Sequence, residues 1–234
     1  MTVFECRGLT KQYGRVLALD SVELTLEGGK VVGLLGPNGS GKTTLIKLAN
    51  GLLTPSAGEV LICGHKPGKE SKALVSYLPD RSYLPDWMSV KQALDMFGDF
   101  YADFRRERAE EMLKTLGIDQ KQRIRQMSKG TREKVQLILV MSRAAKLYLL
   151  DEPIGGVDPA TRDYILHTII ANYEPDAVVL ISTHLISDVE QVLDEVIFIN
   201  RGKIVLHSGT DTIREERGCS VDTLFREVFR CSEN

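Results

Sequence analysis

The stretch GPNGSGKT, residues 36–43, decides the fold, because it matches the pattern G-x-x-x-x-G-K-[ST]. It follows an apolar run, residues 31–35, and opens a segment that favours a helix, residues 42–53. Glycines at this spacing let backbone N–H groups turn inward on a phosphate, and the helix N-terminus adds its positive end. By chance the pattern would arise in about one chain in a hundred of this length, and the strand-loop-helix setting lowers that frequency. The stretch therefore predicts a phosphate-binding loop.

This loop predicts a site for ATP and Mg²⁺. Lys42 would bridge the β- and γ-phosphates, and the hydroxyl of Thr43 would ligate Mg²⁺. The other loop residues expected to bind the nucleotide are Gly36, Asn38, Gly39, Ser40, Gly41 and Thr44. Because the lysine would act on the phosphate that is cleaved, we expect Lys42 to serve catalysis as well as binding.

Apolar runs and helical patterns alternate along the chain, which predicts an α/β core with a mostly parallel sheet. Three runs are apolar throughout, as strands buried on both faces of a parallel sheet are: residues 31–35, 147–150 and 177–181. Each precedes a segment that favours a helix: residues 42–53, 159–172 and 185–193. Residues 195–199 and 204–207 then predict an antiparallel hairpin that closes the sheet.

Before the loop, a period-two pattern predicts an N-terminal antiparallel β subdomain. Val22, Leu24 and Leu26 alternate with polar residues and end at Gly28-Gly29, so one face of this strand would meet water. We expect it to be the opening strand, paired antiparallel because it is only half buried.

Between residues 89 and 146 the pattern is helical and predicts a helical insert in the α/β core. One apolar face comprises Ala93, Leu94, Phe97 and Phe100, and another comprises Met112, Leu113 and Leu116. One further amphipathic helix, packing back on the core, is expected at the end of the chain from Val221, Leu224, Phe225, Val228 and Phe229. We predict a single domain, 1–234, divided into an ATP-binding core with the β subdomain (1–80 and 146–210), a helical subdomain (81–145) and a helical tail (211–234).

Two carboxylates follow the second apolar run, at the sheet edge where α/β folds bind ligands. Successive strand side chains point in opposite directions, so Asp151 and Glu152 take different roles. We assign Asp151 to Mg²⁺ and Glu152 to the attacking water. An Asp-Glu pair at a strand end is on its own more often a solvated turn, so this assignment depends on the phosphate loop. His184 follows the third run, where its imidazole would donate to the γ-phosphate.

With these motifs in order, the chain resembles the ATP-binding-cassette family of ATPases along nearly its whole length. Residues 127–132, MSKGTR, resemble its signature motif, normally Leu-Ser-Gly-Gly-Gln followed by a basic residue. Residues 156–158, GVD, resemble its D-loop, and His184 resembles its switch histidine. The resemblance adds Tyr13, Ser128, Gly130 and Asp158 to the expected nucleotide site, with Tyr13 stacking on adenine. Ser128 can also cap a helix that starts near Thr131 and direct its N-terminus at an anion.

Because each chain carries one phosphate loop and one signature, the resemblance implies a head-to-tail dimer, of two identical or two different ATPase subunits, that sandwiches two ATP molecules. Three residues depart from the family pattern. Asp80 stands where the family has a glutamine; it can ligate Mg²⁺ through oxygen, but it brings negative charge and donates no hydrogen bond. Lys129 replaces a signature glycine and Thr131 the glutamine. We therefore expect a working but slow ATPase.

The wording of residues 77–81 and 151–158 resembles bacterial exporter-type cassette subunits that work with separate membrane chains. The resemblance implies a transmembrane permease whose coupling helix docks beside the helical insert, near Tyr83, Trp87 and Phe97. The start, residues 1–11, lacks the apolar core of a signal peptide, and no apolar run approaches the roughly 18 residues of a membrane span. We expect a cytoplasmic protein, peripheral on the inner face of the cell membrane.

Composition and charge narrow the alternatives. A net charge of −2 gives no electrostatic reason to expect nucleic acid as a partner. The scattered Cys6, Cys63, Cys219 and Cys231 have neither metal nor redox spacing, so reduced thiols are expected. Three rival functions stay open: a cassette ATPase acting on nucleic acid or ribosomes, a kinase built on the same loop, and a switch that clamps ATP without turnover.

Overall fold

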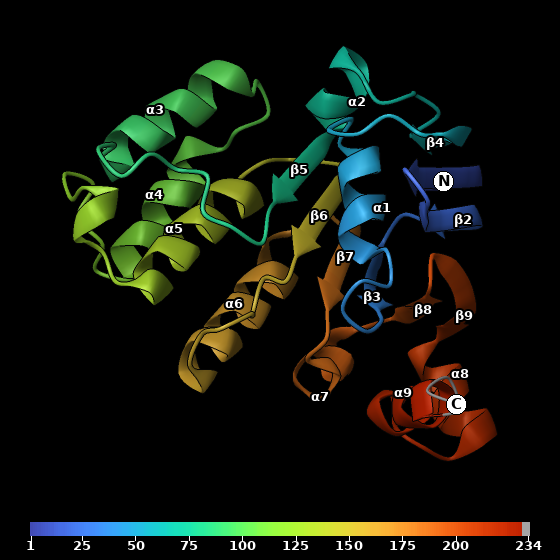
Figure 1. Cartoon of the computed structure of the whole chain (residues 1–234). Coiled ribbons are helices and arrows are strands. Elements are labelled where there is room, and N and C mark those ends of the chain that lie inside the picture. Colours follow the sequence, from blue (N-terminus) through green and yellow to red (C-terminus); the bar gives the residue numbers. More distant parts are fainter. Residues whose placement is uncertain (231–234) are drawn as a thin grey trace.

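The computed structural model describes residues 1–230 and arranges them around two sheets (Figure 1). The smaller, antiparallel sheet has the strand order β2-β1-β4. Its strands are β1 (Thr2–Tyr13), β2 (Val16–Glu27) and β4 (Ala57–Ile62). The expected antiparallel β subdomain is thus confirmed. The expected opening strand was wrong, because β1 precedes it; register shifts between Cys6 and Lys11 break the period-two pattern that would have revealed β1.

The larger sheet confirms the predicted α/β core. Its order is β5-β6-β7-β3-β8-β9, and every neighbouring pair is parallel except the terminal β8–β9 hairpin. The strands are β3 (Lys30–Leu35), β5 (Val75–Leu78), β6 (Leu147–Asp151), β7 (Val178–Thr183), β8 (Glu195–Asn200) and β9 (Lys203–Gly209). The parallel strands deliver the residues that follow them to one edge of the sheet.

Helices cover both faces of this sheet (Figure 1). One apolar core lies between the sheet and α6 (Pro159–Asn172), α7 (Ile186–Val189) and the tail. A second core lies between the sheet, α1 (Lys42–Ala49) and the smaller sheet; α2 (Lys69–Leu74) leads into β5.

The bounds of α6 match the prediction, but two other helices are shorter than expected. α1 ends at Ala49 rather than residue 53, because Gly51 takes a left-handed conformation with φ 66°. Residues 185–193 form only α7 and a 3₁₀ turn, Glu190–Val192.

The helical insert has an apolar core of its own and lies to one side of the sheets (Figure 1, green). It comprises α3 (Val90–Phe100), α4 (Arg106–Thr115), a 3₁₀ turn (Ile124–Gln126) and α5 (Lys129–Met141). Ala93, Leu94 and Phe97 are buried as predicted. The placement of Phe100 on that buried face was wrong: it is the last residue of α3 and is 77% exposed.

A buried arginine joins the insert to the edge strand β5. Arg143 is only 1% exposed, and its guanidinium binds the Asp103 carboxylate at 3.0 Å and donates to the carbonyl oxygens of Ala73 and Val75. The guanidinium carbon also lies 3.8 Å from the centre of the Tyr101 ring. This attachment holds the start of β5 against the insert.

The tail contains two helices rather than the single one predicted. α8 (Thr210–Arg217) ends at Gly218, whose φ of 62° breaks the helix, and α9 (Val221–Arg230) follows. α9 packs on the core as expected, with Phe225 edge-on to Phe198 at 5.4 Å. Cys6, Cys63 and Cys219 are free thiols, whereas Cys231 and the rest of the predicted tail to 234 lie outside the described residues. Within residues 1–230, no helix combines the length and apolarity that crossing a membrane requires.

Candidate active site at the edge of the sheet

The predicted phosphate loop lies between β3 and α1, with its lysine folded over its own backbone. Lys42 Nζ donates to the carbonyl oxygens of Gly36 at 2.7 Å and Pro37 at 3.2 Å. Gly36 allows a close approach, because a Cβ there would lie 2.3 Å from the carbonyl oxygen of Ile199. Gly41, with φ 116°, leads into α1. The loop thus gathers backbone groups and an ammonium at the N-terminus of α1.

Two features of the loop fit a bound polyphosphate. The buried Ser40 Oγ has no hydrogen-bond partner among the described residues, which leaves a donor for a ligand. Burial lowers the pKa of the Lys42 ammonium, while the Glu152 and Asp151 carboxylates oppose this shift. A phosphate would replace the hydration that Lys42 loses in this position.

Oxygen atoms from three elements meet at Asp151. Asp151 is 1% exposed, and its Oδ1 accepts hydrogen bonds from Ser182 Oγ at 2.5 Å and Thr43 Oγ1 at 3.3 Å. Burial raises the pKa of the Asp151 carboxyl, and the two hydroxyl donors oppose that shift. A carboxylate beside a threonine hydroxyl is the oxygen-rich donor set that Mg²⁺ requires. Two of the three residues predicted to hold the metal, Thr43 and Asp151, therefore lie in contact.

Glu152 turns away from Asp151 and meets the predicted histidine. Its φ of 51° is left-handed, so the chain leaves the strand direction at this residue. Oε2 of Glu152 lies 3.0 Å from His184 Nδ1 and accepts a hydrogen bond from Thr183 Oγ1 at 3.1 Å. The ends of β6 and β7 therefore bring Glu152 and His184 together at the sheet edge where both were predicted to lie.

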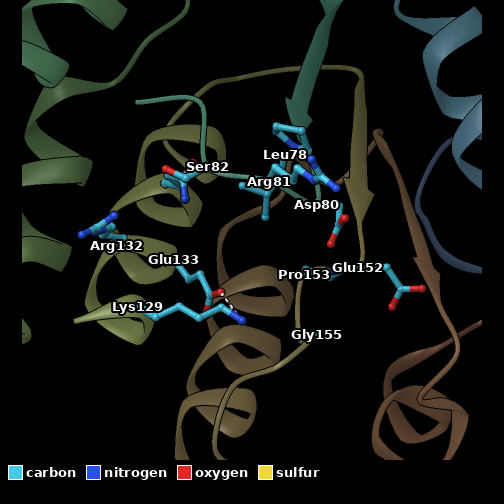
Figure 2. A pocket seen from close by; sticks show the side chains of 12 residues that line it. Leu78, Asp80, Arg81, Ser82, Lys129, Arg132, Glu133, Glu152, Pro153 and Gly155 are labelled. Carbon is cyan, nitrogen blue, oxygen red and sulfur yellow. Dashed lines mark ion pairs between the residues drawn. The ribbon is translucent and has the colours of Figure 1, made fainter. Parts of the chain in front are cut away.

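Asp80, the third predicted metal ligand, lines a cavity together with Glu152. A cavity of about 450 Å³ separates the end of β5 from α5, and Asp80, Glu152 and Lys129 line it (Figure 2). The Asp80 charge also contributes to the raised pKa of Asp151. This carboxylate thus faces the same centre as the two acidic residues at the end of β6, Asp151 and Glu152.

The signature residues and Asp158 form a separate pair of helix N-termini. Ser128 caps α5 by accepting a hydrogen bond from the Thr131 N–H at 3.2 Å, and α5 begins at Lys129 rather than near Thr131. Asp158 caps α6 through the Thr161 N–H at 3.0 Å. A Cβ on Gly130 would lie 3.6 Å from Thr161, so Gly130 sits where α5 and α6 meet. None of these hydrogen bonds and close approaches involves the phosphate loop, residues 36–43.

Tyr13 ends β1 with its ring 45% exposed and the Lys11 ammonium 5.2 Å from the ring centre. The partner strand β2 reaches the loop, because a Cβ on Gly41 would lie 2.6 Å from the Ala18 carbonyl oxygen. The hairpin of Tyr13 therefore borders the loop, and the role of Tyr13 in stacking on adenine stays a prediction.

A second cavity, of about 490 Å³, lies between β5 and the insert, and its lining is mostly apolar. Its lining includes Tyr83 and Phe97, two of the residues predicted to lie near a docked permease helix. It also includes Leu52, Met96 and Phe100, which were not part of that prediction. Trp87 is not among its lining residues and is 61% exposed.

Sequence reasoning also missed the hydroxyls of Ser182 and Thr183, which orient Asp151 and Glu152. Two hydroxyl residues directly after an apolar strand and before a histidine were the available signal.

Comparisons with known proteins agree with this geometry. A family model described as "ABC transporter" matches residues 19–155. The daunorubicin resistance ATP-binding protein DrrA3 of Streptomyces coeruleorubidus is 30% identical over 97% of this chain and 75% of its own length. An uncharacterised ABC transporter ATP-binding protein of Nostoc is 31% identical over 85% of this chain, which spans only 62% of that relative. The solved structure of an ATP-binding subunit of an ABC transporter superposes with a TM-score of 0.88 at 26% identity, covering 97% of this chain and 100% of that one.

Proposed function

Because the chain belongs to the ABC transporter family of ATP-binding subunits, we propose that it hydrolyses Mg·ATP at residues 36–43 and powers a separate membrane-spanning partner. The observation that carries this proposal is the meeting of five side chains at one sheet edge. The loop lysine Lys42, the Thr43–Asp151 pair and the Glu152–His184 pair come from separate segments of the chain. Phosphoryl transfer to water needs this combination of phosphate clamp, metal ligands and water-orienting base.

Each residue has a role that follows from its contacts. Lys42 and the loop N–H groups would hold the β- and γ-phosphates, and Thr43 and Asp151, with Asp80 nearby, would hold Mg²⁺. Bound Mg²⁺ would neutralise charge on the phosphate oxygens. Glu152 would accept a proton from the attacking water, while His184 and Thr183 keep its carboxylate oriented.

A second copy, or a second ATPase subunit, would complete the site. Ser128, Gly130 and Asp158 lie at the adjoining N-termini of α5 and α6, which present backbone N–H groups and positive helix ends outward. A head-to-tail arrangement would bring these groups to the γ-phosphate held by the partner. ATP would then join the two subunits, and its hydrolysis would let them separate.

The apolar cavity beside the insert suits a helix of the membrane partner. Leu52 and Phe100 line it and expose 57% and 77% of their surface, an arrangement that favours an apolar partner. Relatives named for drug resistance and Nod factor export support an exporter subunit at the inner face of the membrane. Relatives named as ABC transporter ATP-binding proteins also favour transport over the ribosome or nucleic-acid alternative.

Phosphate release by the purified chain tests this function. We expect Mg-dependent release that Glu152→Gln reduces at least a hundredfold, because the water loses its proton acceptor. The same variant should elute as a dimer on gel filtration with ATP. Glu107→Gln, which removes an exposed carboxylate from α4, is the matched control and should behave as wild type. Wild-type protein without Mg-dependent phosphate release would contradict the proposal.

A further inference from the structure

Lys129, the residue that replaces a signature glycine, contacts the turn that carries Glu152. Its Nζ donates to the carbonyl oxygen of Gly156 at 3.2 Å, across 27 residues of sequence. We propose that Lys129 is a positioning residue, which holds the turn over residues 152–156 and thereby orients the Glu152 carboxylate of its own chain. This inference rests on the proposed ATPase function, in which Glu152 activates water.

The turn needs support from outside because its backbone is unusual. Glu152 and Gly156 both have left-handed conformations, with φ of 51° and 71°. A residue other than glycine in this region is strained and persists only where its surroundings hold it. At the start of the turn, the Glu152 N–H donates to the Ser182 carbonyl oxygen at 2.9 Å. Within the turn, the Gly155 N–H donates to the Glu152 carbonyl oxygen at 3.0 Å. Lys129 supplies the corresponding contact at the far end.

The absence of a side chain at Gly156 leaves room for this ammonium. A Cβ at position 156 would lie only 2.5 Å from Lys129 Nζ, so any other residue would displace the lysine. Figure 2 shows the Lys129 side chain reaching from α5 across the cavity towards the segment of Glu152, Pro153 and Gly155. Lysine at 129 and glycine at 156 therefore fit each other in one chain.

The carboxylate of Glu133 keeps the ammonium in this place. Glu133 Oε1 lies 3.7 Å from Lys129 Nζ, one helical turn along α5. Its Oε2 is buried without a hydrogen-bond partner in the described part of the chain, so the carboxylate depends on the nearby positive charge. Because the Lys129 side chain is 69% exposed, the ion pair alone contributes little stability. Its effect is to direct Nζ between Glu133 and Gly156.

Steady-state kinetics and amide exchange test this role together. We expect Lys129→Gln to lower kcat about tenfold or more and to change KM for ATP less than twofold, because a misplaced base slows chemistry without weakening binding. In the nucleotide-free chain, amides of residues 152–158 should exchange several-fold faster. Lys129→Arg should restore part of kcat by keeping a cationic donor. Lys114→Gln, at an exposed lysine of α4, is the charge-matched control.

A double-mutant cycle adds specificity. Gly156→Ala both pushes against Nζ and strains the left-handed backbone at position 156. Because only the first effect passes through Lys129, Gly156→Ala should lower kcat by a smaller factor in the Lys129→Gln background than in wild type. Unchanged amide exchange over 152–158 in Lys129→Gln would overturn the inference. A raised KM, with loss of the ATP-bound dimer in a Glu152→Gln background, would also overturn it and would place Lys129 on the partner's nucleotide. If wild type shows no ATPase activity, the proposed function fails, yet the exchange measurement still decides whether Lys129 holds the turn.

Discussion

The polar cavity beside Glu152 and the apolar cavity beside the insert meet at one segment, residues 77–83, and have opposite character. Asp80, Arg81 and Ser82 line the cavity beside Glu152, whereas Tyr77 and Tyr83 line the apolar cavity beside the insert, and Pro79 borders both. Polar groups gather in the first because parallel strands end at a common edge. The second is apolar because it forms where the edge strand β5 meets a separate apolar core. Position relative to the sheet therefore decides the chemistry of each cavity.

The same helix also lines both cavities. Lys129 and Glu133 of α5 face the polar cavity, while Val140 and Arg143, at and just beyond its end, face the apolar one. Between them, the Gln136 side chain accepts a hydrogen bond from the Tyr83 N–H at 3.1 Å. A movement of α5 would therefore change both cavities, which gives the nucleotide site a physical route to a partner.

The largest effect should come from removing the cation of the phosphate loop, which lies at the same sheet edge as the polar cavity. Lys42→Ala deletes the ammonium that would contact the phosphates, and ATP affinity should fall at least a hundredfold. Titration with a fluorescent nucleotide measures this. Lys47→Ala, at an exposed position of the same helix, should bind as wild type does. Unchanged affinity of the Lys42 variant would refute the role of the loop.

The next largest effect should come from the buried arginine that attaches the insert to β5, beside the apolar cavity. Arg143→Met leaves Asp103 and two backbone carbonyls without their buried partner, and we expect about 3–5 kcal/mol loss in the free energy of unfolding. Urea denaturation measures the loss. Arg106→Met removes an arginine whose partners Asp95 and Glu110 are exposed, and should cost less than about 1 kcal/mol. Equal losses in the free energy of unfolding for the two variants would show that Arg143 stabilises the protein no more than an exposed arginine does.

A smaller effect should separate the apolar side from the polar one. Phe100→Asp places a charge at the exposed rim of the apolar cavity, so recovery of the chain with the proposed membrane partner should fall about tenfold. Phosphate release by the isolated chain should stay within twofold, because Phe100 lines only the distant cavity. Val205→Asp, on β9, is the control for an exposed apolar position. Loss of ATPase activity in the Phe100 variant would contradict the separation.

The smallest effect concerns the cap at the start of α5. Ser128→Ala removes the acceptor for the Thr131 N–H and should lower the free energy of unfolding by about 1 kcal/mol. Ser128→Asp keeps an acceptor and should restore the stability measured in urea. A loss unaffected by aspartate would show that the cap is not the cause.

Sequence reasoning succeeded where the signal is local. Asp158 and Pro159 start α6 as residue types that begin helices, and the apolar runs mark β3 and β6 within one residue of their bounds. It failed where neighbours in space override the pattern. The bulges of β1 follow from its pairing with two strands, and the exposure of Phe100 follows from its place at the rim of the insert.

The motif spacing alone located Lys42, Asp151, Glu152 and His184, because strand-loop-helix units must place these side chains at one edge whatever surrounds them. It was silent on which of them touch. That Glu152 meets His184 rather than solvent, and that Lys129 meets Gly156, depends on how β6, β7 and α5 pack, over separations of 32 and 27 residues. The chemistry of a local motif depends on residues adjacent in the sequence, whereas contacts between distant segments form only when the hydrophobic cores pack.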